Sequence, residues 1–163
     1  MIVIIEGLDG VGKTTISKEL CKRYNYIYIK ESFTNDTNEK YQRIVNMLKK
    51  LGDDKIYIYD RSTIIDNKIY SFLNDKNDDF EISQDVENMI LDNCKIIHLI
   101  LEENKRKERF LSRGDKYITN DLISKISQNY IDFYKQRSNF IYLLPLVDDI
   151  EENINKIIKI IKK

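Results

Sequence analysis

"IVIIEGLDGVGKTTI", residues 2–16, decides the fold that this sequence predicts. The run Ile2–Ile5 is continuously apolar and β-branched, which is typical of a buried parallel strand. Three of the five glycines in the 163-residue chain then follow within six positions. Residues 14–24 are polar, with apolar side chains at helical spacing. The stretch therefore predicts a strand, a tight glycine-rich turn and a helix.

The glycine-rich turn fits the phosphate-binding loop pattern G-x-x-x-x-G-K-[ST]. Glycines allow successive backbone N–H groups to turn around an anion, and the following helix offers it a positive N-terminus. We expect Lys13 to reach the β- and γ-phosphates of ATP and the Thr14 hydroxyl to ligate Mg²⁺. The residues predicted to bind ATP are Gly7, Asp9, Gly10, Val11, Gly12, Lys13, Thr14 and Thr15.

Strands and helices alternate along the whole chain. Strands are expected at 2–6, 26–30, 55–60, 95–101 and 140–147, the last near an edge because it contains Pro145. Helices are expected at 13–24, 38–52, 66–74, 83–93, 102–114, 119–136 and from about 150, with a polar turn over 74–80. The pattern predicts one α/β domain spanning 1–163, a five-stranded parallel sheet with helices on both faces, with the phosphate loop at 7–15.

Polar residues follow several of these strands, at the sheet edge where parallel α/β folds bind ligands. Asp60 ends the third strand beside the first, the position of a carboxylate that holds the Mg²⁺ shell. Arg61 follows it and can clamp a phosphate with its planar guanidinium. Thr14 and Asp60 are therefore the predicted metal ligands.

Composition narrows the classes of partner. Lys and Arg number 27, as do Asp and Glu, and the pI is about 6.6, so no basic excess indicates nucleic acid. No apolar run reaches the roughly 20 residues of a membrane span, and the first strand begins too early to leave room for a signal peptide. Cys21 and Cys94 lie far apart and are expected to be reduced. We expect a cytoplasmic protein that binds small molecules.

Four stretches together resemble the thymidylate kinase-like branch of the P-loop kinases: "EGLDGVGKTT", an acid after the second strand, "YDRS", and "RFLSRGDKY". The resemblance implies a P-loop NTPase with a short lid at about 105–118, using Mg·ATP, and suggests a homodimer. It also implies that the acceptor is a deoxynucleoside monophosphate, with dTMP as the first candidate. Asp9 would face the acceptor sugar, where the similar deoxynucleoside kinases usually carry Asn, and Arg61 would hold the acceptor phosphate.

Alternatives stay open because the family's R-E-P-G-G-T stretch reads "KESFTN" here. Lys30 replaces the arginine, Glu31 is kept, and the proline and glycines are missing. A deoxynucleoside kinase would use Glu31 as general base on a 5′-hydroxyl. With a monophosphate acceptor Glu31 would orient Lys30, substrate or water. A nucleotide-binding regulatory module is the third possibility, although it needs no clamp like Arg61.

Loop residues 8–11 are non-basic, so a catalytic arginine must come from elsewhere, and the lid stretch "KRKERFLSRGDK" offers Arg106, Arg109 and Arg113. The predicted catalytic residues are Lys13, Arg61, Arg109 and Arg113. Three aromatic residues, Phe33, Tyr41 and Tyr70, border the acceptor cleft and could stack on a base. The predicted substrate-binding residues are Asp9, Lys30, Glu31, Phe33, Tyr41, Arg43, Arg61 and Tyr70. His98, within "KIIHLIL", is expected to be a core histidine.

Overall fold

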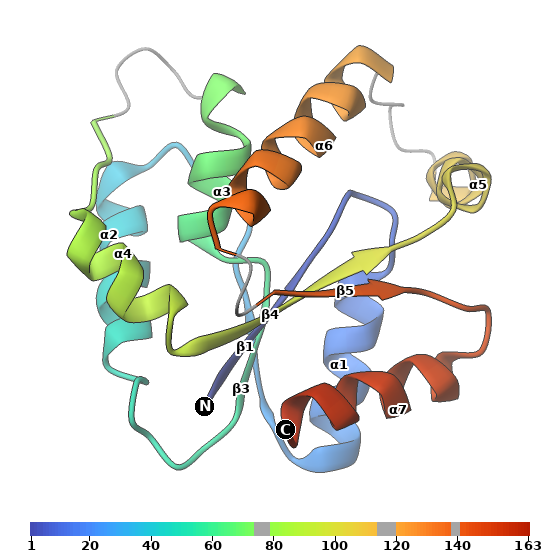
Figure 1. Cartoon of the computed structure of the whole chain (residues 1–163), viewed down its shortest axis with the longest axis horizontal. Coiled ribbons are helices and arrows are strands. Elements are labelled where there is room, and N and C mark those ends of the chain that lie inside the picture. Colours follow the sequence, from blue (N-terminus) through green and yellow to red (C-terminus); the bar gives the residue numbers. More distant parts are fainter. Residues whose placement is uncertain (74–78, 114–119, 138–140) are drawn as a thin grey trace.

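The computed structural model describes residues 1–73, 79–113, 120–137 and 141–163, without the side chains of Phe110, Leu111, Arg113 and Asn120. Its five strands form one sheet in the order β2-β3-β1-β4-β5, and every neighbouring pair is parallel (Figure 1). The strands are β1 (Ile2–Glu6), β2 (Ile27–Lys30), β3 (Tyr57–Asp60), β4 (Cys94–Ile100) and β5 (Ile141–Pro145). The predicted five-stranded parallel sheet is confirmed, and Pro145 ends an edge strand.

Helices cover both faces of the sheet (Figure 1). They are α1 (Lys13–Tyr24), α2 (Thr37–Leu48), α3 (Thr63–Ile69), α4 (Gln84–Leu91), α5 (Glu103–Arg113), α6 (Asn120–Lys135) and α7 (Ile150–Ile161), with a 3₁₀ turn at Ser71–Leu73. α1 and α7 pack on one face, and α2, α3, α4 and α6 on the other. α5 follows β4 beyond the carboxyl edge of the sheet.

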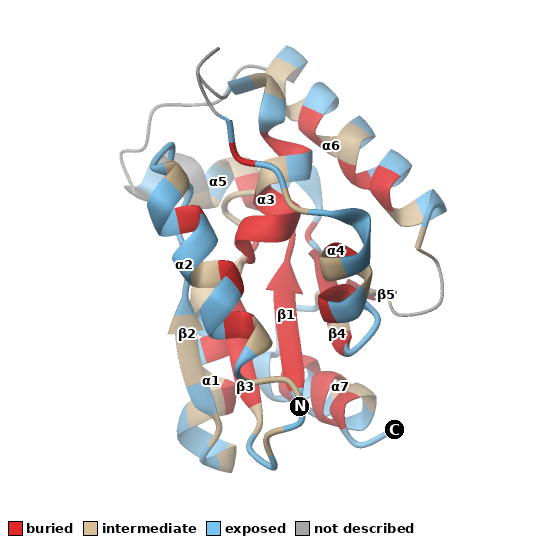
Figure 2. Ribbon diagram, turned by 90° about the vertical axis from the view of Figure 1, so that its left-hand side faces the viewer, coloured by how far each residue is buried: buried red, intermediate tan, exposed pale blue. Residues whose placement is uncertain are grey.

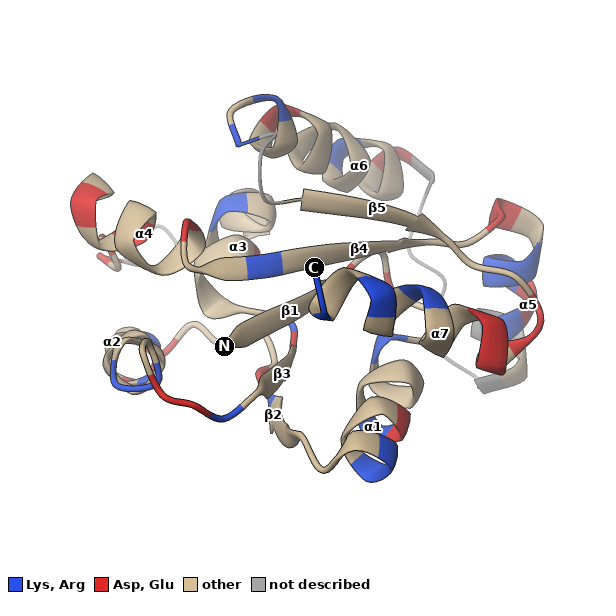
Figure 3. Ribbon diagram, turned by 60° about the horizontal axis from the view of Figure 1, so that its bottom comes forward, with Lys and Arg blue, Asp and Glu red and all other residues tan. Residues whose placement is uncertain are grey.

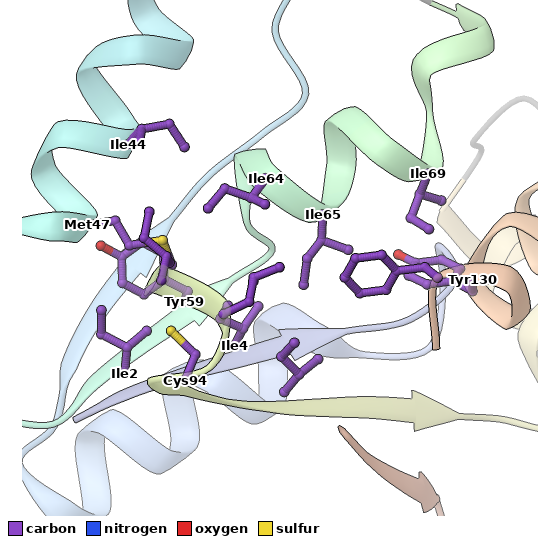
Figure 4. Packing of buried hydrophobic residues seen from close by; sticks show 14 of the residues in the cluster. Ile2, Ile4, Ile44, Met47, Tyr59, Ile64, Ile65, Ile69, Cys94 and Tyr130 are labelled. Atoms are coloured by element: carbon purple, nitrogen blue, oxygen red, sulfur yellow. The ribbon is translucent and has the colours of Figure 1, made fainter. Parts of the chain in front are cut away.

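Alternate residues of β1 belong to two separate hydrophobic cores, one on each face of the sheet. Ile2 and Ile4 belong to the cluster with α2, α3, α4 and α6, shown in Figure 4, and Val3 and Ile5 to the cluster with α1 and α7. Figure 2 shows β1 buried along its length, in contrast to the edge strand β2. The unbroken apolar run that predicted a buried parallel strand therefore lies in the centre of the sheet.

Two helices differ from the sequence expectation. α2 ends at Leu48 and not near Gly52, because Lys50 N–H bonds to Met47 O and Leu51 N–H to Leu48 O, which tightens the chain into turns. α3 begins at Thr63, three residues earlier than expected, after Ser62 in the N-cap position. Its early start places the first turn of α3 directly beside Arg61.

Charged residues of both signs are interspersed on α5, whereas on α7 the acids lie in the first turn and the lysines further along the helix (Figure 3). Each of β1 to β4 carries a single Asp, Glu or Lys residue. His98 is buried on β4 against the rings of Tyr130 and Tyr134, as expected for a core histidine. Within the described ranges, no helix combines the length and the apolar character needed to cross a bilayer.

Candidate active site

The phosphate loop joins β1 to α1 with two glycines that other residues could not replace easily. Gly7 has φ +137°, and a Cβ there would lie 2.6 Å from the Leu99 carbonyl oxygen. Gly12 caps α1 with φ +101°, and its Cβ would lie 3.2 Å from Nη1 of Arg109. Residues with a side chain rarely adopt such φ values, and at these two positions a Cβ would also lie too close to neighbouring atoms.

Lys13 is the first residue of α1 and is buried, with 6% of its surface exposed. Its Nζ donates to the carbonyl oxygens of Gly7 at 2.7 Å and Leu8 at 3.0 Å. Burial, followed by the charge of Arg61, lowers the pKa of Lys13. The ammonium group therefore sits inside the loop, where it can turn toward a bound phosphate.

Thr14 and Asp60 meet, although they are 46 positions apart in the sequence. Thr14 Oγ1 donates to Asp60 Oδ2 at 2.5 Å, and Tyr28 Oη donates to the same oxygen at 2.9 Å. Among the described residues, no group of three or more His, Cys, Asp and Glu side chains is placed to hold a metal. Mg²⁺ commonly binds one or two hard oxygen ligands of the protein and completes its shell with phosphates and water. The Thr14 hydroxyl and the Asp60 carboxylate fit that pattern.

Arg61 lies at the centre of the site. Its Nη2 pairs with Asp9 Oδ1, and its Nη1 lies 3.3 Å from both Asp66 Oδ1 and Tyr70 Oη. The guanidinium also lies over the Tyr70 ring, 5.5 Å from its centroid. Lys13 Nζ is 3.5 Å from the same Asp9 Oδ1 atom. The lysine of the phosphate loop and the arginine after β3 are thus close enough to share one anionic oxygen.

A cavity of about 450 Å³ opens beside these groups. Its lining includes six of the eight residues expected to bind the acceptor: Asp9, Lys30, Glu31, Phe33, Arg61 and Tyr70. Phe33 and Tyr70 pack edge to face, with ring centroids 6.3 Å apart. Gly10, Gly12, Lys13, Thr14 and Thr15 from the phosphate loop line the same cavity.

The apolar wall of this cavity was not anticipated from the sequence. It consists of Leu73 after α3 and of Leu122 and Ile126 on α6. The spacing of Leu122 and Ile126 by four residues is a signal for one helical face, but it does not say which neighbour that face meets.

Glu31 caps α3. It is 6% exposed, and its Oε2 accepts a hydrogen bond of 2.6 Å from the backbone N–H of Thr63. Burial raises the pKa of Glu31, and the bond from Thr63 opposes that rise. Glu31 therefore combines a structural contact at a helix N-terminus with a place in the cavity lining.

The two other residues expected to bind the acceptor, Tyr41 and Arg43, are not in the described lining of this cavity. Tyr41 is exposed on α2, where its hydroxyl donates to Glu81 O at 3.1 Å and its ring packs on Phe80. The inward face of α2 consists of Lys40, Ile44 and Met47, so Tyr41 points aside.

Arg43 stands one layer behind the cavity. It donates to the carbonyl oxygen of Ser32 at 2.6 Å and to Thr63 Oγ1 at 3.1 Å. Ser32 itself lines the cavity, so Arg43 supports the wall next to Phe33. Its position suits a supporting contact better than a direct one to the base.

A second hollow of about 280 Å³ lies on the other side of the phosphate loop. It is lined by Val11, Gly12, Thr15, Arg109, Val147 and Asp148, among others. Arg109 reaches it from α5 and donates through Nη1 to Val11 O at 3.0 Å. Arg113, the second lid arginine predicted to be catalytic, ends α5, and its side chain lies outside the described residues.

Two buried acids at the site, Glu6 and Asp66, were not predicted from the sequence. Burial, opposed chiefly by Arg61, raises the pKa of Asp66 to about 6. Glu6 is the last residue of β1 and is wholly buried. A signal existed, because Glu6 is the one charged residue of an otherwise apolar strand.

No protein-family model and no curated protein matches the chain, but solved structures share its fold. The YorR protein of Bacillus subtilis, in complex with phosphorylated GDP, has a TM-score of 0.78 at 24% identity, covering 99% of this chain and 96% of that chain. Deoxyadenosine kinase from M. mycoides has a TM-score of 0.64 at 21% identity, covering 99% of both chains. Thymidylate kinase from Candida albicans has a TM-score of 0.65 at 15% identity, covering 99% of this chain and 90% of that chain. The chain has the fold of the P-loop kinases.

Proposed function

We propose that this protein is a nucleoside monophosphate kinase that transfers the γ-phosphoryl group of ATP to a deoxynucleoside monophosphate, dTMP being the first candidate. The observation that carries this proposal is the convergence of Lys13 and Arg61 on Asp9 Oδ1. Two cations from different elements, focused on one point, suit a phosphoryl group that passes from a donor phosphate to an acceptor phosphate. Similarity of fold to a deoxyadenosine kinase and a thymidylate kinase supports the substrate class.

Each residue then has a chemical role. The phosphate loop and Lys13 bind the β- and γ-phosphates of ATP, and Arg61 binds the acceptor phosphate in line with them. Thr14 and Asp60 would hold Mg²⁺, which neutralises charge that develops on the phosphate oxygens. Phe33, Tyr70 and the apolar wall take up the acceptor base by stacking and burial. Asp9 leaves Arg61 when the acceptor phosphate arrives and becomes free to bind its sugar.

The proposal is tested by ADP release in a coupled assay with Mg·ATP. The acceptors are dTMP, dUMP, dGMP, dAMP and dCMP, each compared with its free nucleoside. Turnover on a monophosphate supports the proposal, whereas turnover on free nucleosides alone overturns it in favour of a deoxynucleoside kinase. ATP binding without turnover on any of them indicates the regulatory module.

Arg109 gives a prediction for the donor side. Its guanidinium touches the phosphate loop at Val11 O, so it can turn to the transferring phosphoryl group. We expect Arg109→Ala to lower kcat about a hundredfold, because one preorganised donor is lost from the transition state. Lys105→Ala is the matched control on α5, since Lys105 pairs with Asp148 at the surface. Equal kcat values for the two variants would remove Arg109 from the mechanism.

A deoxynucleoside kinase is the second candidate because Glu31 is buried and lines the cavity, where a general base for a 5′-hydroxyl would be needed, and burial raises its pKa. If the acceptor is a phosphate, Glu31→Gln should lower kcat by about tenfold or less, since the amide oxygen can still accept from Thr63 N–H. If the acceptor is a hydroxyl, the same variant loses the base and kcat falls by about 10³. Measuring kcat on dTMP and on thymidine separates the two.

A further inference from the structure

The start of α3 is held by the carboxyl groups of Glu6, the last residue of β1, and of Glu31, which follows β2. Ser62 occupies the N-cap position but makes no side-chain hydrogen bond to the helix. Its backbone N–H donates instead to Glu6 Oε1 at 3.0 Å, and the N–H of Thr63 donates to Glu31 Oε2 at 2.6 Å. Side chains at the ends of β1 and β2 therefore take up N–H groups that a helix N-terminus leaves unpaired.

These bonds bracket an unusual backbone conformation at Arg61, which has φ +73°. A residue other than glycine rarely adopts this left-handed region unless its surroundings hold it there. Here the N–H of Arg61 donates to Ile5 O at 3.2 Å, and the next N–H, that of Ser62, donates to Glu6. Hydrogen bonds to β1 thus hold the backbone on both sides of the Arg61 Cα. They fix the point from which the Arg61 side chain extends into the site.

Glu6 has a second partner. Its Oε2 accepts a hydrogen bond of 3.0 Å from the hydroxyl of Tyr130, which lies on α6 and is 2% exposed. In Figure 4 the ring of Tyr130 lies beside Ile69 of α3. Asn129, the residue before it, donates to Ile69 O at 2.7 Å. α6 is therefore tied to the beginning of α3 through Glu6 and to its end directly.

Burying an apolar residue in place of Glu6 would cost less free energy, because a carboxyl group with no exposed surface carries a large desolvation penalty. Lys13, the cation of the neighbouring loop, donates its hydrogen bonds to Gly7 O and Leu8 O. Within the part of the chain that the structure describes, Glu6 accepts its hydrogen bonds from Ser62 and Tyr130. The carboxyl group thus serves a geometric purpose, because it joins α6 to the residue after Arg61.

We propose that Glu6 and Tyr130 are positioning residues: Tyr130 fixes Glu6, Glu6 fixes the Ser62 amide, and together they set Arg61 for the acceptor phosphate. The last step rests on the proposed function, since it takes Arg61 to bind that phosphate. The first two steps concern only the hydrogen bonds of the folded chain.

Tyr130→Phe tests the chain of contacts, with Tyr134→Phe as a matched control on the same helix. Each variant removes one hydroxyl, but the Tyr134 hydroxyl contacts His98 Nδ1 and not Glu6. Heteronuclear NMR of the nucleotide-free protein would follow the amide resonances of Ser62 and Arg61. Both resonances should shift in Tyr130→Phe and stay in place in Tyr134→Phe. Equal shifts in the two variants, or none in either, would overturn the proposal.

Steady-state kinetics of the same proteins test whether these contacts position Arg61 for the acceptor phosphate. In Tyr130→Phe the KM for dTMP should rise about fivefold, as the loss of one net hydrogen bond implies, with the KM for ATP unchanged within twofold. In an Arg61→Ala background, adding Tyr130→Phe should change the KM for dTMP by less than twofold, because the effect acts through Arg61. An equal increase in both backgrounds contradicts the proposal. If the wild-type protein phosphorylates no acceptor, the proposed function fails and the amide comparison alone decides the positioning contacts.

Discussion

Lys13→Ala should lower kcat for phosphoryl transfer by about 10³ or more, because under the proposed function Lys13 binds the β- and γ-phosphates of ATP. Lys13 Nζ already lies within hydrogen-bond distance of two carbonyl oxygens of that loop and 3.5 Å from Asp9 Oδ1. The measurement is single-turnover transfer from Mg·ATP to dTMP at saturating concentrations of both. Lys18→Ala is the control, since Lys18 is exposed on the same helix.

Loss of activity in Lys13→Ala must be separated from loss of fold, and Lys13→Met does this. The methionine keeps most of the buried aliphatic volume but carries no charge. Because burial lowers the pKa of Lys13, the charged form is disfavoured in the native state. The melting temperature of Lys13→Met should therefore match or exceed that of the wild type, while its kcat falls as in Lys13→Ala. Activity within tenfold of wild type in either variant would exclude Lys13 from the chemistry.

The sequence predicted the strand, the glycine-rich turn and the helix of residues 2–24 well because local rules determine them. A buried strand, glycines that tolerate positive φ, and a helix N-terminus follow one another within residues 2–24, and each has its own pattern. Thr14 and Asp60 were predicted together for a different reason. The carboxyl ends of adjacent parallel strands must meet at one edge of the sheet, so a topology inferred from alternation brings them close.

Sequence patterns were weakest where packing between helices decides which residues face the cleft. Tyr41 was expected to border the acceptor cleft and to stack on a base, but it is exposed, and the inward face of α2 carries Lys40. The capping of α3 by Glu31 joins residues 32 positions apart, and the bond from Tyr130 to Glu6 joins residues 124 apart. No sequence pattern marks these two side-chain contacts, because they depend on how α3 and α6 pack beside the edge of the sheet. A charged residue inside a buried strand, as at Glu6, is the nearest available signal.

Arg61→Ala should lower kcat/KM for dTMP by about a thousandfold, since removing one partner of a buried charge pair costs roughly 4 kcal/mol. The KM for ATP should change less than threefold, because Lys13 and the backbone of the phosphate loop remain. This selective loss distinguishes an acceptor clamp from a general stabiliser of the site. Steady-state kinetics with each substrate varied in turn measures it.

Arg61→Lys controls for the charge that Arg61→Ala removes. Asp66 is 3% exposed and pairs with Arg61, so alanine leaves a buried carboxylate alone, at a cost to the free energy of unfolding of about 3 kcal/mol. Lysine keeps a positive charge for Asp66 and Asp9 but lacks the planar fork that binds phosphate through two nitrogens. We therefore expect Arg61→Lys to melt close to wild type and still lose about a hundredfold in kcat/KM for dTMP. If Arg61→Lys instead recovers wild-type kcat/KM, the arginine supplies only charge, and bidentate binding of the acceptor phosphate is ruled out. If both variants retain wild-type kcat/KM for an accepted free nucleoside while losing dTMP, the cleft binds the two acceptors through different groups, and Arg61 is the group that selects for the phosphate.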